Sequence, residues 1–365
     1  MRTVKLGSLG EIFIGLTYKP DDVTNNGTIV LRSSNIQNGC LDFNDIVRVK
    51  CEIKEKLYVK ENDILMCSRN GSAQLVGKCT LISEINEAMT FGAFMTIIRT
   101  PVNSFIRYYF DSDNFRKQLK GSATTTINQI TRTMLEEIEI PFYKAEEQQK
   151  IAITLKKIYN LISLRKQQLA KLDELVKARF VELFGDPITN PMGWKLQRFD
   201  SLCENLDSRR RPITASEREA GIYPYYGASG IVDYVADYIF DENILLVSED
   251  GANLLMRSTP IAFSVSGKVW VNNHAHVVRF EKMSMQKYIE IFFSLIDISD
   301  HITGSAQPKL NQAKLNAMMF PVPSDERLDA FLRFIEQTDK SKSAIQQSLD
   351  KLETLKKALM QKYFG

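Results

Sequence analysis

Two long stretches of this chain carry apolar residues at alternating spacings of four and three positions. The first stretch runs from Ile151 to Leu183 and the second from Phe331 to Tyr363, and each position of the second lies 180 residues after one of the first. This spacing puts the residues on one face of an α-helix and is the pattern of a coiled-coil seam. The sequence therefore predicts two long helices, each with an apolar stripe that a partner helix has to cover.

Basic residues interrupt both seams, and this bears on how the helices pair. The seam positions are Ile151, Leu155, Ile158, Ile162, Arg165, Leu169, Leu172, Val176, Arg179 and Leu183, then Phe331, Ile335, Thr338, Lys342, Ile345, Leu349, Leu352, Lys356, Leu359 and Tyr363. A seam with two cations is a poor partner for its own copy, so we expect the two helices to pair with each other. Only the short segment GDPITNPMGW separates the end of the first helix from the second domain, and the second helix starts directly after that domain. The second helix can therefore pack along the first only by running back, so the pair is predicted to be antiparallel.

The ends of the helices are marked in the sequence. Pro141 and Pro321 precede them, acidic residues stand near each start, and Gly185 followed by Asp186-Pro187 stops the first. The first helix is predicted to span about 34 residues, or ~50 Å at 1.5 Å per residue. A rod of this kind suits two similar modules held at a set distance, as on a DNA duplex whose half-sites are ~34–36 Å apart.

The helices belong to a repeat that covers the whole chain. Residues 171–185 and 351–365 share seven identities, residues 63–71 match 243–251 at the same offset of 180, and the offset drifts to 190 near the start and 183 near residue 121. The repeat predicts a domain over residues 1–142, a spacer helix over 143–185, a second domain over 186–322 and a second helix over 323–365. The expected fold is α/β, with two similar mixed α/β domains, an antiparallel coiled coil between them and pseudo-two-fold symmetry.

Each domain is predicted to hold short strands followed by one helix. In the first, β-rich runs lie at 28–31, 46–49, 63–67, 75–82 and 94–99 and the helix at 104–119; in the second, runs lie at 231–235, 244–247, 269–271 and 275–280 and the helix at 285–298. The turns between these elements are rich in side chains that bind phosphates or base edges. Solvated turns have the same composition, so both interpretations stay open.

The turn residues of both halves form the set of candidate DNA contacts. Their recurrence at equivalent places favours a function, and residues 209–211 form the densest positive cluster in a loop. The set is Arg32, Ser33, Ser34, Asn35, Arg69, Asn70, Ser72, Gln74, Thr125, Asn128, Arg209, Arg210, Arg211, Tyr226, Ser229, Asp250, Asn253, His274, Gln307, Lys309 and Asn311.

Composition excludes several classes of protein. A net charge of +3 permits nucleic acid as a partner without arguing for it. No apolar run approaches the ~20 residues of a membrane span and the start has no export signal, so we expect a cytoplasmic protein without a membrane partner. Five cysteines without a CxxC pair predict reduced thiols, and neither disulfides nor a zinc site. His274 and His276 lie two apart on a predicted strand, but without a carboxylate or thiol at ligand spacing no metal site is predicted.

The sequence leaves two other functions open. Asp21, Glu52 and Lys54 form a loose metal-dependent nuclease pattern, although the second half has no equivalent and coincidence is the better explanation. A protein scaffold is the other alternative, favoured by Tyr225, Tyr226 and the small net charge. No phosphate-binding loop, dinucleotide motif, HExxH or GxSxG is present, so no nucleotide-driven motor is expected.

The region from residue 140 to residue 194 closely resembles the central spacer of the specificity subunits of type I restriction-modification systems. The resemblance is carried by Ile140-Pro141, Glu146-Glu147-Gln148, Leu164-Arg165-Lys166-Gln167-Gln168, Lys171-Leu172-Asp173-Glu174-Leu175, Arg179-Phe180, Phe184-Gly185-Asp186-Pro187 and Gly193-Trp194. In the second half, residues 226–230 and 243–251 look like the target recognition domains of that family. The second spacer departs from the pattern at Ser324-Asp325-Glu326, where a Glu-Gln pair is usual.

The resemblance implies a DNA reader that is not itself an enzyme. Each target recognition domain would bind one half of a split, asymmetric site on double-stranded DNA, and the spacer would set the length of the gap. The chain would dock two methyltransferase subunits, which use S-adenosylmethionine, and through them restriction-translocase subunits, which use ATP. It would bind neither cofactor itself.

Overall fold

The computed structural model describes residues 2–121, 129–304 and 307–365. It divides into two compact units, Met1–Gln167 with Gln346–Gly365, and Gln168–Ile345. Each unit holds one β-rich domain and one stretch of each long helix, α4 (Ala145–Phe184) and α8 (Asp325–Phe364). Among the described residues, no helix combines the length and the apolar character that crossing a bilayer requires.

The first domain is built on a four-stranded antiparallel sheet and a smaller three-stranded one. The four-stranded sheet has the order β2 (Glu11–Ile14), β10 (Met95–Arg99), β7 (Ile64–Cys67), β8 (Cys79–Leu81), and the three-stranded sheet the order β6 (Val47–Val49), β3 (Val23–Leu31), β9 (Met89–Phe91). Two small pairs complete it: β1 (Thr3–Lys5) with β11 (Glu139–Pro141), and β4 (Ile36–Gln37) with β5 (Cys40–Leu41). β3 and β9 are parallel, so the domain has a mixed sheet.

The second domain repeats this topology. Its main sheet has the order β13 (Glu204–Asn205), β20 (Ala275–Arg279), β17 (Ile244–Ser248), β18 (Ala262–Val265). Its second sheet also has four strands, one more than in the first domain, in the order β15 (Gly230–Val235), β14 (Ala220–Gly227), β19 (Lys268–Val271), β16 (Phe240–Asp241). β12 (Lys195–Arg198) pairs with β21 (Met319–Val322) as β1 pairs with β11, and β14 is parallel to β19 as β3 is to β9. Two similar mixed α/β domains, as the repeat predicts, are therefore present.

The structure corrects the offset of the repeat at its central strand. Leu65 faces Ile97 across the first main sheet, whereas Leu246 faces Val277 across the second. The facing strands β10 and β20 are 180 residues apart, so β7 and β17 correspond at an offset of 181. Aligning the two halves by identical residues, at an offset of 180, displaces β17 by one residue relative to β7. In a strand, a one-residue displacement exchanges the two faces.

The helices of the domains differ from the prediction of one helix in each: the short helices α3 (Arg132–Glu137), α5 (Asn253–Met256) and α7 (Gln312–Ala317) were not expected, and the helix expected in the first domain is divided. α6 (Met283–Leu295) agrees with the helix expected near 285–298. The single helix expected over 104–119 is two helices, α1 (Asn103–Tyr109) and α2 (Asp113–Gly121). The break has a local cause: the Ser112 hydroxyl accepts a hydrogen bond from Phe115 N (3.2 Å) and so begins a new helix.

Each long helix contains 40 residues, six more than the apolar spacing alone indicates. The extra residues are polar first turns, where Glu146-Glu147 and Asp325-Glu326 suit the positive end of the helix dipole. Gly185 ends α4 with φ of +81°, a left-handed conformation that favours glycine. Every predicted seam residue is buried or half-buried.

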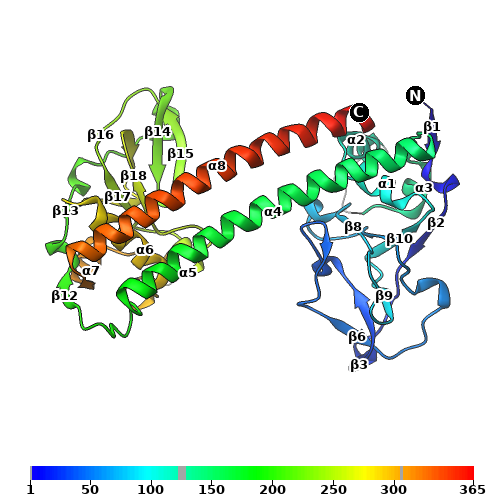
Figure 1. The fold of residues 1–365 in the computed structure, drawn as a ribbon, viewed down its shortest axis with the longest axis horizontal. Coiled ribbons are helices and arrows are strands. Elements are labelled where there is room, and N and C mark those ends of the chain that lie inside the picture. The colour runs from blue at the N-terminus through cyan, green and yellow to red at the C-terminus, as the bar shows by residue number, and fades with distance from the viewer. Residues whose placement is uncertain (1, 122–128, 305–306) are drawn as a thin grey trace. The chain divides into compact units, whose positions relative to one another are not determined.

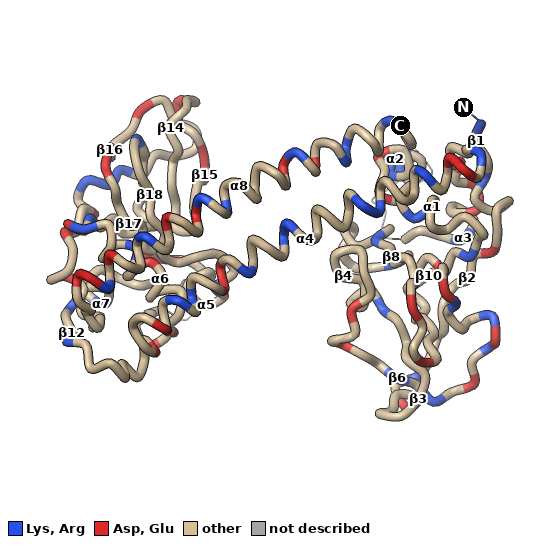
Figure 2. Tube along the Cα trace, viewed as in Figure 1, with Lys and Arg blue, Asp and Glu red and all other residues tan. Residues whose placement is uncertain are grey.

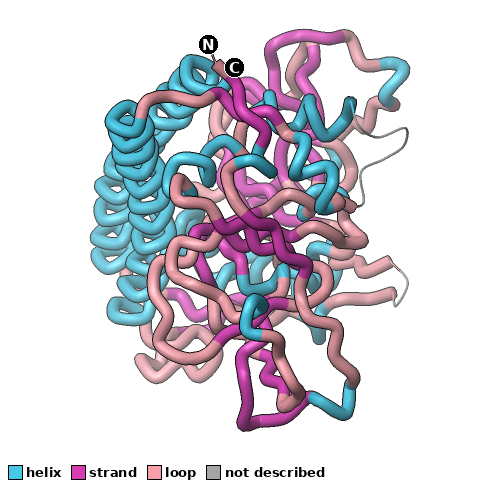
Figure 3. The backbone as a smooth tube through the Cα atoms, turned by 90° about the vertical axis from the view of Figure 1, so that its right-hand side faces the viewer, coloured by secondary structure: helices cyan, strands magenta, loops and turns pink. Residues whose placement is uncertain are grey.

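In both units the two helices lie side by side in opposite directions (Figures 1 and 3). In the first unit the start of α4 meets the end of α8: Leu155 shares a core with Phe364, whose ring lies 5.4 Å from that of Phe105. In the second unit the end of α4 meets the start of α8, and the rings of Phe184 and Phe331 are 5.2 Å apart. Each unit by itself thus confirms the antiparallel pairing.

The basic seam residues find partners across the pair. Arg165 Nε lies 3.3 Å from the Ser348 hydroxyl in the first unit, and Lys342 Nζ lies 2.6 Å from an Asp173 carboxylate oxygen in the second. Lys356 lies over the Tyr159 ring at 4.4 Å. Lysine and arginine can cover apolar surface with their stems while their charges reach an acid, a hydroxyl or an aromatic ring.

Candidate nucleic-acid interface

Two predicted turns of the first domain come together at the ends of strands. The turn after β3 and the turn after β7 meet where Asn70 Nδ2 donates to Ser33 Oγ (3.3 Å). A cavity of about 510 Å³ opens beside them, lined by Tyr18, Arg32, Ser33, Ser34 and Phe94 among others. Arg32 pairs with Asp45 at 2.7 Å, and its Nε is buried without a hydrogen-bond partner among the described residues.

Asn35 does not belong to this surface, although it is one of the predicted contacts. It is 1% exposed, its amide nitrogen donates to the carbonyl oxygens of Asp42 and Asp45 (2.9 Å each), and its Oδ1 accepts from Arg32 N (2.8 Å). Its amide is fully used in shaping the turn, so it has nothing to offer a base. Sequence reasoning misplaced it because a buried turn asparagine and an exposed one look alike.

The other predicted contacts of the first half are exposed or outside the described residues. Arg69, Ser72 and Gln74 are exposed, and Ser72 N donates to Asn70 Oδ1 (2.9 Å). Thr125 and Asn128 lie outside the described residues. Arg69 makes no ion pair within the described part of the chain, and its guanidinium lies 5.3 Å from the ring centre of Phe94.

The positive cluster at 209–211 is largely neutralised by neighbouring acids. Arg209 pairs with Glu242 (2.7 Å). Arg210 pairs with Glu249 (2.6 Å) and donates to the carbonyl oxygen of Ala275 (2.8 Å). Arg211 is exposed and makes no ion pair with another described residue. Of the three cations predicted to attract phosphate, the structure leaves Arg211 uncompensated. Figure 2 shows the same mixture of acidic and basic residues in each domain.

A buried ionic network holds the loops of the second domain. His276 is 1% exposed, with Nδ1 2.6 Å from Asp207 and Nε2 2.8 Å from the carbonyl oxygen of Leu310. Burial raises the pKa of Asp207, but the hydrogen bond and charge of His276 outweigh burial and hold the pKa below its usual value. The pKa of Glu249 is also lowered, because hydrogen bonds from Arg210 and Lys309 outweigh its burial.

The same network brings together the ligand atoms of Asp207, Glu249 and His276 within 4.8 Å, an arrangement that could hold a metal. The guanidinium of Arg210 already lies against both carboxylates, at 3.3 Å from Asp207 and 2.6 Å from Glu249. Because a cation occupies the acidic side of the cluster, its chemistry is that of a structural ion network. Asp21 and Glu52, the acids of the nuclease alternative, take part in no cluster of three such groups within the described residues.

The remaining predicted contacts of the second half divide into exposed and structural ones. Ser229 is exposed at the tip of the β14–β15 hairpin, and Gln307 is exposed. Tyr226 lies within strand β14, where a turn was predicted, and is half-buried. The side chains of Asn253 and Asn311 accept hydrogen bonds from the backbone N–H groups of Thr259 and Lys314, respectively, and so shape their own turns.

Asp250, His274 and Lys309 meet at one place. Asp250 and Lys309 form a β-bridge, Lys309 Nζ lies 3.0 Å from Glu249, and His274 Nδ1 lies 3.0 Å from the Asp250 carboxylate. Three segments far apart in the sequence thus form one polar surface at the ends of β17 and β20. The sequence predicted these residues singly, but it could not show that they are neighbours.

Phe94 is the residue that sequence reasoning missed. The sequence predicts it as the first residue of a strand, whereas it lies in the turn before β10 and is 58% exposed. Its position directly before a buried strand gave no signal for a surface role, because an aromatic residue there is usual for a strand that faces a core.

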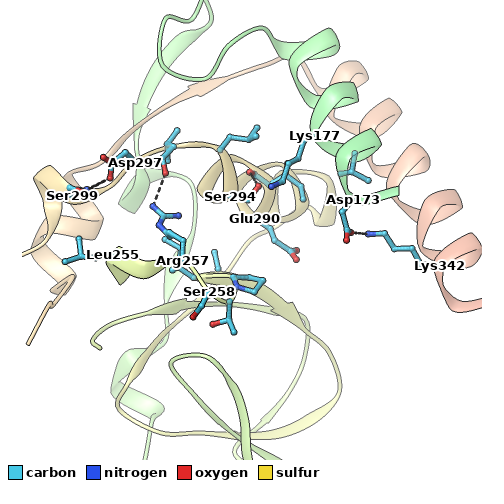
Figure 4. A pocket seen from close by; sticks show the side chains of 18 residues that line it. Asp173, Lys177, Leu255, Arg257, Ser258, Glu290, Ser294, Asp297, Ser299 and Lys342 are labelled. Atoms are coloured by element: carbon cyan, nitrogen blue, oxygen red, sulfur yellow. Dashed lines mark hydrogen bonds and ion pairs between the residues drawn. The ribbon is translucent and has the colours of Figure 1, made fainter. Parts of the chain in front are cut away.

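A second cavity, of about 780 Å³, lies within the second unit between α4, α6 and the segment around α5 (Figure 4). Three charged residues on its walls, Asp173, Arg257 and Lys342, already have partners. Asp173 pairs with Lys342, and Arg257 donates to the carbonyl oxygens of Phe293 and Ile296 at the end of α6 (2.9 Å each). Burial lowers the pKa of Arg257. The Asp173 pair joins α4 to α8, and the Arg257 contacts lie within the second domain.

Comparisons with known proteins agree with the two-copy plan. The family model described as the type I restriction modification DNA specificity domain matches residues 1–174 and 191–359. A specificity subunit of the Escherichia coli enzyme EcoKI is 23% identical over 399 residues, 96% of this chain and 85% of its own length. A putative type I specificity subunit of Haemophilus influenzae is 32% identical over 130 residues, which cover 36% of this chain and 33% of that protein.

The fold also has a counterpart among solved structures. The S subunit of a type I restriction-modification system from M. genitalium superposes with a TM-score of 0.63 at 16% identity, over 100% of this chain and 96% of that one. At that identity the likeness concerns the fold alone. It agrees with the predicted α/β class, with two similar domains and two long antiparallel helices.

Proposed function

Because this chain belongs to the family of type I restriction-modification DNA specificity domains, we propose that its two domains read the two halves of one split DNA site. Members of this family supply DNA sequence recognition, and the enzymatic activities of the complex belong to other subunits, in agreement with the prediction that this chain is not an enzyme. Residues 1–142 and 186–322 are the proposed readers, and residues 143–185 and 323–365 the proposed spacers. The chain would act in the cytoplasm, where the DNA is.

The observation that carries the proposal is one strand topology with two different sets of end residues. The main sheets have the same order, yet the strand ends carry Arg69 and Phe94 in one domain and Asp250 and His274 in the other. A shared scaffold with different polar ends is suited to recognising two different short sequences, because base edges are distinguished by their pattern of donors, acceptors and methyl groups.

The helix pair supplies a surface for the partner subunits. On α4, within the first unit, Ile153, Leu161 and Leu164 are 48%, 44% and 54% exposed, although α8 covers the seam. Leu161 and Leu164 are three residues apart and Leu164 is eleven from Ile153, spacings that keep them on one side of the helix. We propose that one methyltransferase subunit docks there, that a second docks on the corresponding surface of the second unit, and that restriction-translocase subunits join through them.

Methylation of a randomised duplex library by the complex with its methyltransferase tests the proposed function. The modified molecules should share one motif made of two specific parts with a gap of constant length. Leu164→Asp should weaken methyltransferase association, and Glu174→Asp, an exposed charge-conserving change on the same helix, is the matched control. Enrichment of a single uninterrupted motif would contradict two half-site readers, and no enrichment at all would favour the protein scaffold.

A further inference from the structure

The turn before β10 in the first domain and the turn before β20 in the second occupy the same structural position. Gly92 N donates to the carbonyl oxygen of Leu31 (2.9 Å) in the first domain, and Asn272 N donates to that of Tyr226 (3.0 Å) in the second. Phe94 lies two residues after Gly92, and His274 lies two residues after Asn272. Phe94 and His274 therefore occupy equivalent positions. The β-bridge Arg69–Gln129 likewise corresponds to the β-bridge Asp250–Lys309.

At this position each domain holds one exposed ring against one charged group. Phe94 is 58% exposed, and the Arg69 guanidinium lies over its ring with 5.3 Å to the ring centre. The His274 side chain is 49% exposed, and its Nδ1 lies 3.0 Å from Asp250. The charged partner is a cation in one domain and an anion in the other, so the two sites differ in chemistry while the backbone is shared.

Phe94 is rigidly held, which distinguishes it from an apolar residue left at a mobile loop tip. Its carbonyl oxygen accepts hydrogen bonds from Ser68 N (2.9 Å), Arg69 N (3.1 Å) and Ser68 Oγ (3.0 Å). The carbonyl oxygen of His274 accepts one from Glu249 N (2.9 Å) in the same way. A ring whose backbone is fixed loses little conformational entropy when it meets a partner, so these positions are pre-organised for contact.

We propose that Phe94 and His274 are the specificity-determining residues at which the two domains distinguish their half-sites. Phe94 contacts the 5-methyl group of a thymine, and His274 forms a hydrogen bond to a base edge through Nε2. This inference rests on the proposed function. The methyl group of thymine is the apolar feature that base pairs present in the major groove, and an aromatic ring is a known partner for it.

The geometry favours edge contact over insertion of Phe94 between bases. Insertion needs both faces of a ring, and the guanidinium of Arg69 covers one of them. Arg69, which makes no ion pair with a described residue, is then positioned to offer its remaining N–H groups to the neighbouring base or phosphate. For His274, the Asp250 carboxylate can only accept a hydrogen bond, so Nδ1 donates to it and Nε2 is left for the DNA.

Motif selection with the assembled methyltransferase complex tests this assignment. Phe94→Ala should lose discrimination at one base pair in one half of the motif, and His274→Ala at one base pair in the other half, with the gap unchanged. Phe43→Ala is the matched control. Phe43 is a phenylalanine of the same domain, 44% exposed, and it lies outside the turn that holds Phe94. Thermal unfolding of each complex shows whether the variants fold.

A second measurement requires no variant of the protein. Replacing the thymine at the Phe94-dependent position by uracil removes only the methyl group, and binding of the wild-type complex should weaken about fourfold, the effect of one buried methyl group. Phe94→Ala should bind both duplexes equally. The assignment is overturned if that base pair contains no thymine, if uracil is tolerated by the wild type, or if Phe94→Ala and His274→Ala alter the same half.

The outcomes separate this inference from the function beneath it. A wild-type complex that selects no split motif refutes the proposed function. A split motif that both variants leave unchanged refutes only the role of Phe94 and His274.

Discussion

The two domains share the interior of one fold but differ at the ends of its strands. Val277 and Ile97 are both fully buried at equivalent places of the main sheets, with 0% exposure. Where the same strands begin, the second domain holds an ionic network around His276, while the first has the neutral Thr96 at the corresponding position. Apolar packing therefore keeps the fold, and the residues that leave the core are free to diverge.

The helix ends, by contrast, are anchored alike. Phe184 at the end of α4 packs on Tyr288 (4.9 Å between ring centres), and Phe364 at the end of α8 packs on Tyr109 (5.7 Å). The repeat has thus kept one aromatic contact between a helix end and its domain in both copies. It follows that each domain should depend on the helix whose end it holds.

The largest expected effect comes from removing this anchor. Phe364→Ala should lower the free energy of unfolding of the first unit by about 3–5 kcal/mol, because Phe364 is fully buried and its loss leaves a cavity. Both tryptophans, Trp194 and Trp270, lie in the second unit, so their fluorescence is a built-in control. Hydrogen exchange should show loosening of the first unit at denaturant concentrations where tryptophan fluorescence stays native. Equal loss in both units would mean that the anchor acts globally.

The ionic network allows the converse test, in which the second unit is destabilised and not the first. His276→Ala should destabilise the second unit by about 3 kcal/mol, because it leaves the buried Asp207 with one partner fewer. Denaturant unfolding followed by tryptophan fluorescence measures the change. Thr96→Ala in the first domain is the matched variant and should cost less, since it removes no charge partner. Because both tryptophans lie in the second unit, its effect is followed by hydrogen exchange of the first unit. A loss as large for Thr96→Ala as for His276→Ala would contradict a special role for the network.

Acid should weaken the second unit through the same residues. The folded pKa values of Asp207 and Glu249 are lowered, so their contribution to stability is present above the ordinary pKa values near 4 and is lost as the pH falls through the lower folded values. The free energy of unfolding from tryptophan fluorescence should therefore begin to fall below about pH 5 and keep falling until both folded carboxylates are protonated. In the double variant Asp207→Asn, Glu249→Gln this fall should be smaller, and an unchanged slope would exclude these two carboxylates as its source.

The smallest effect separates two neighbouring cations. Arg211→Ala should reduce the slope of log affinity against log salt by about 1, as loss of one phosphate contact does. Arg209→Ala should change the slope less, because Arg209 is already paired with Glu242. Titration of the complex with duplex at several salt concentrations gives both slopes. Equal effects would show that the ion pair of Arg209 opens on DNA.

The sequence by itself determined the two long helices, their antiparallel direction and the duplication of the domain. The helices follow from local periodicity, the duplication from matches about 180 residues apart, and the direction from the short connections between helix and domain. Ile151, Phe331 and the other seam positions are covered as predicted, because apolar spacing leaves a helix a single face to bury. The break at Ser112 was missed because one hydroxyl competed with a helical pattern.

Only the tertiary structure decided which polar residues remain available for a partner. Asn35 and Arg210 look like surface residues in the sequence, yet one is buried in its own turn and the other bridges Asp207 and Glu249. Phe94 looks like a core residue and is exposed. Whether a polar side chain is exposed or hydrogen-bonded depends on segments that are far away in the sequence. The one-residue offset of β7 against β17 is likewise set by strand pairing across the sheet. Such long-range contacts leave no periodic trace in the sequence.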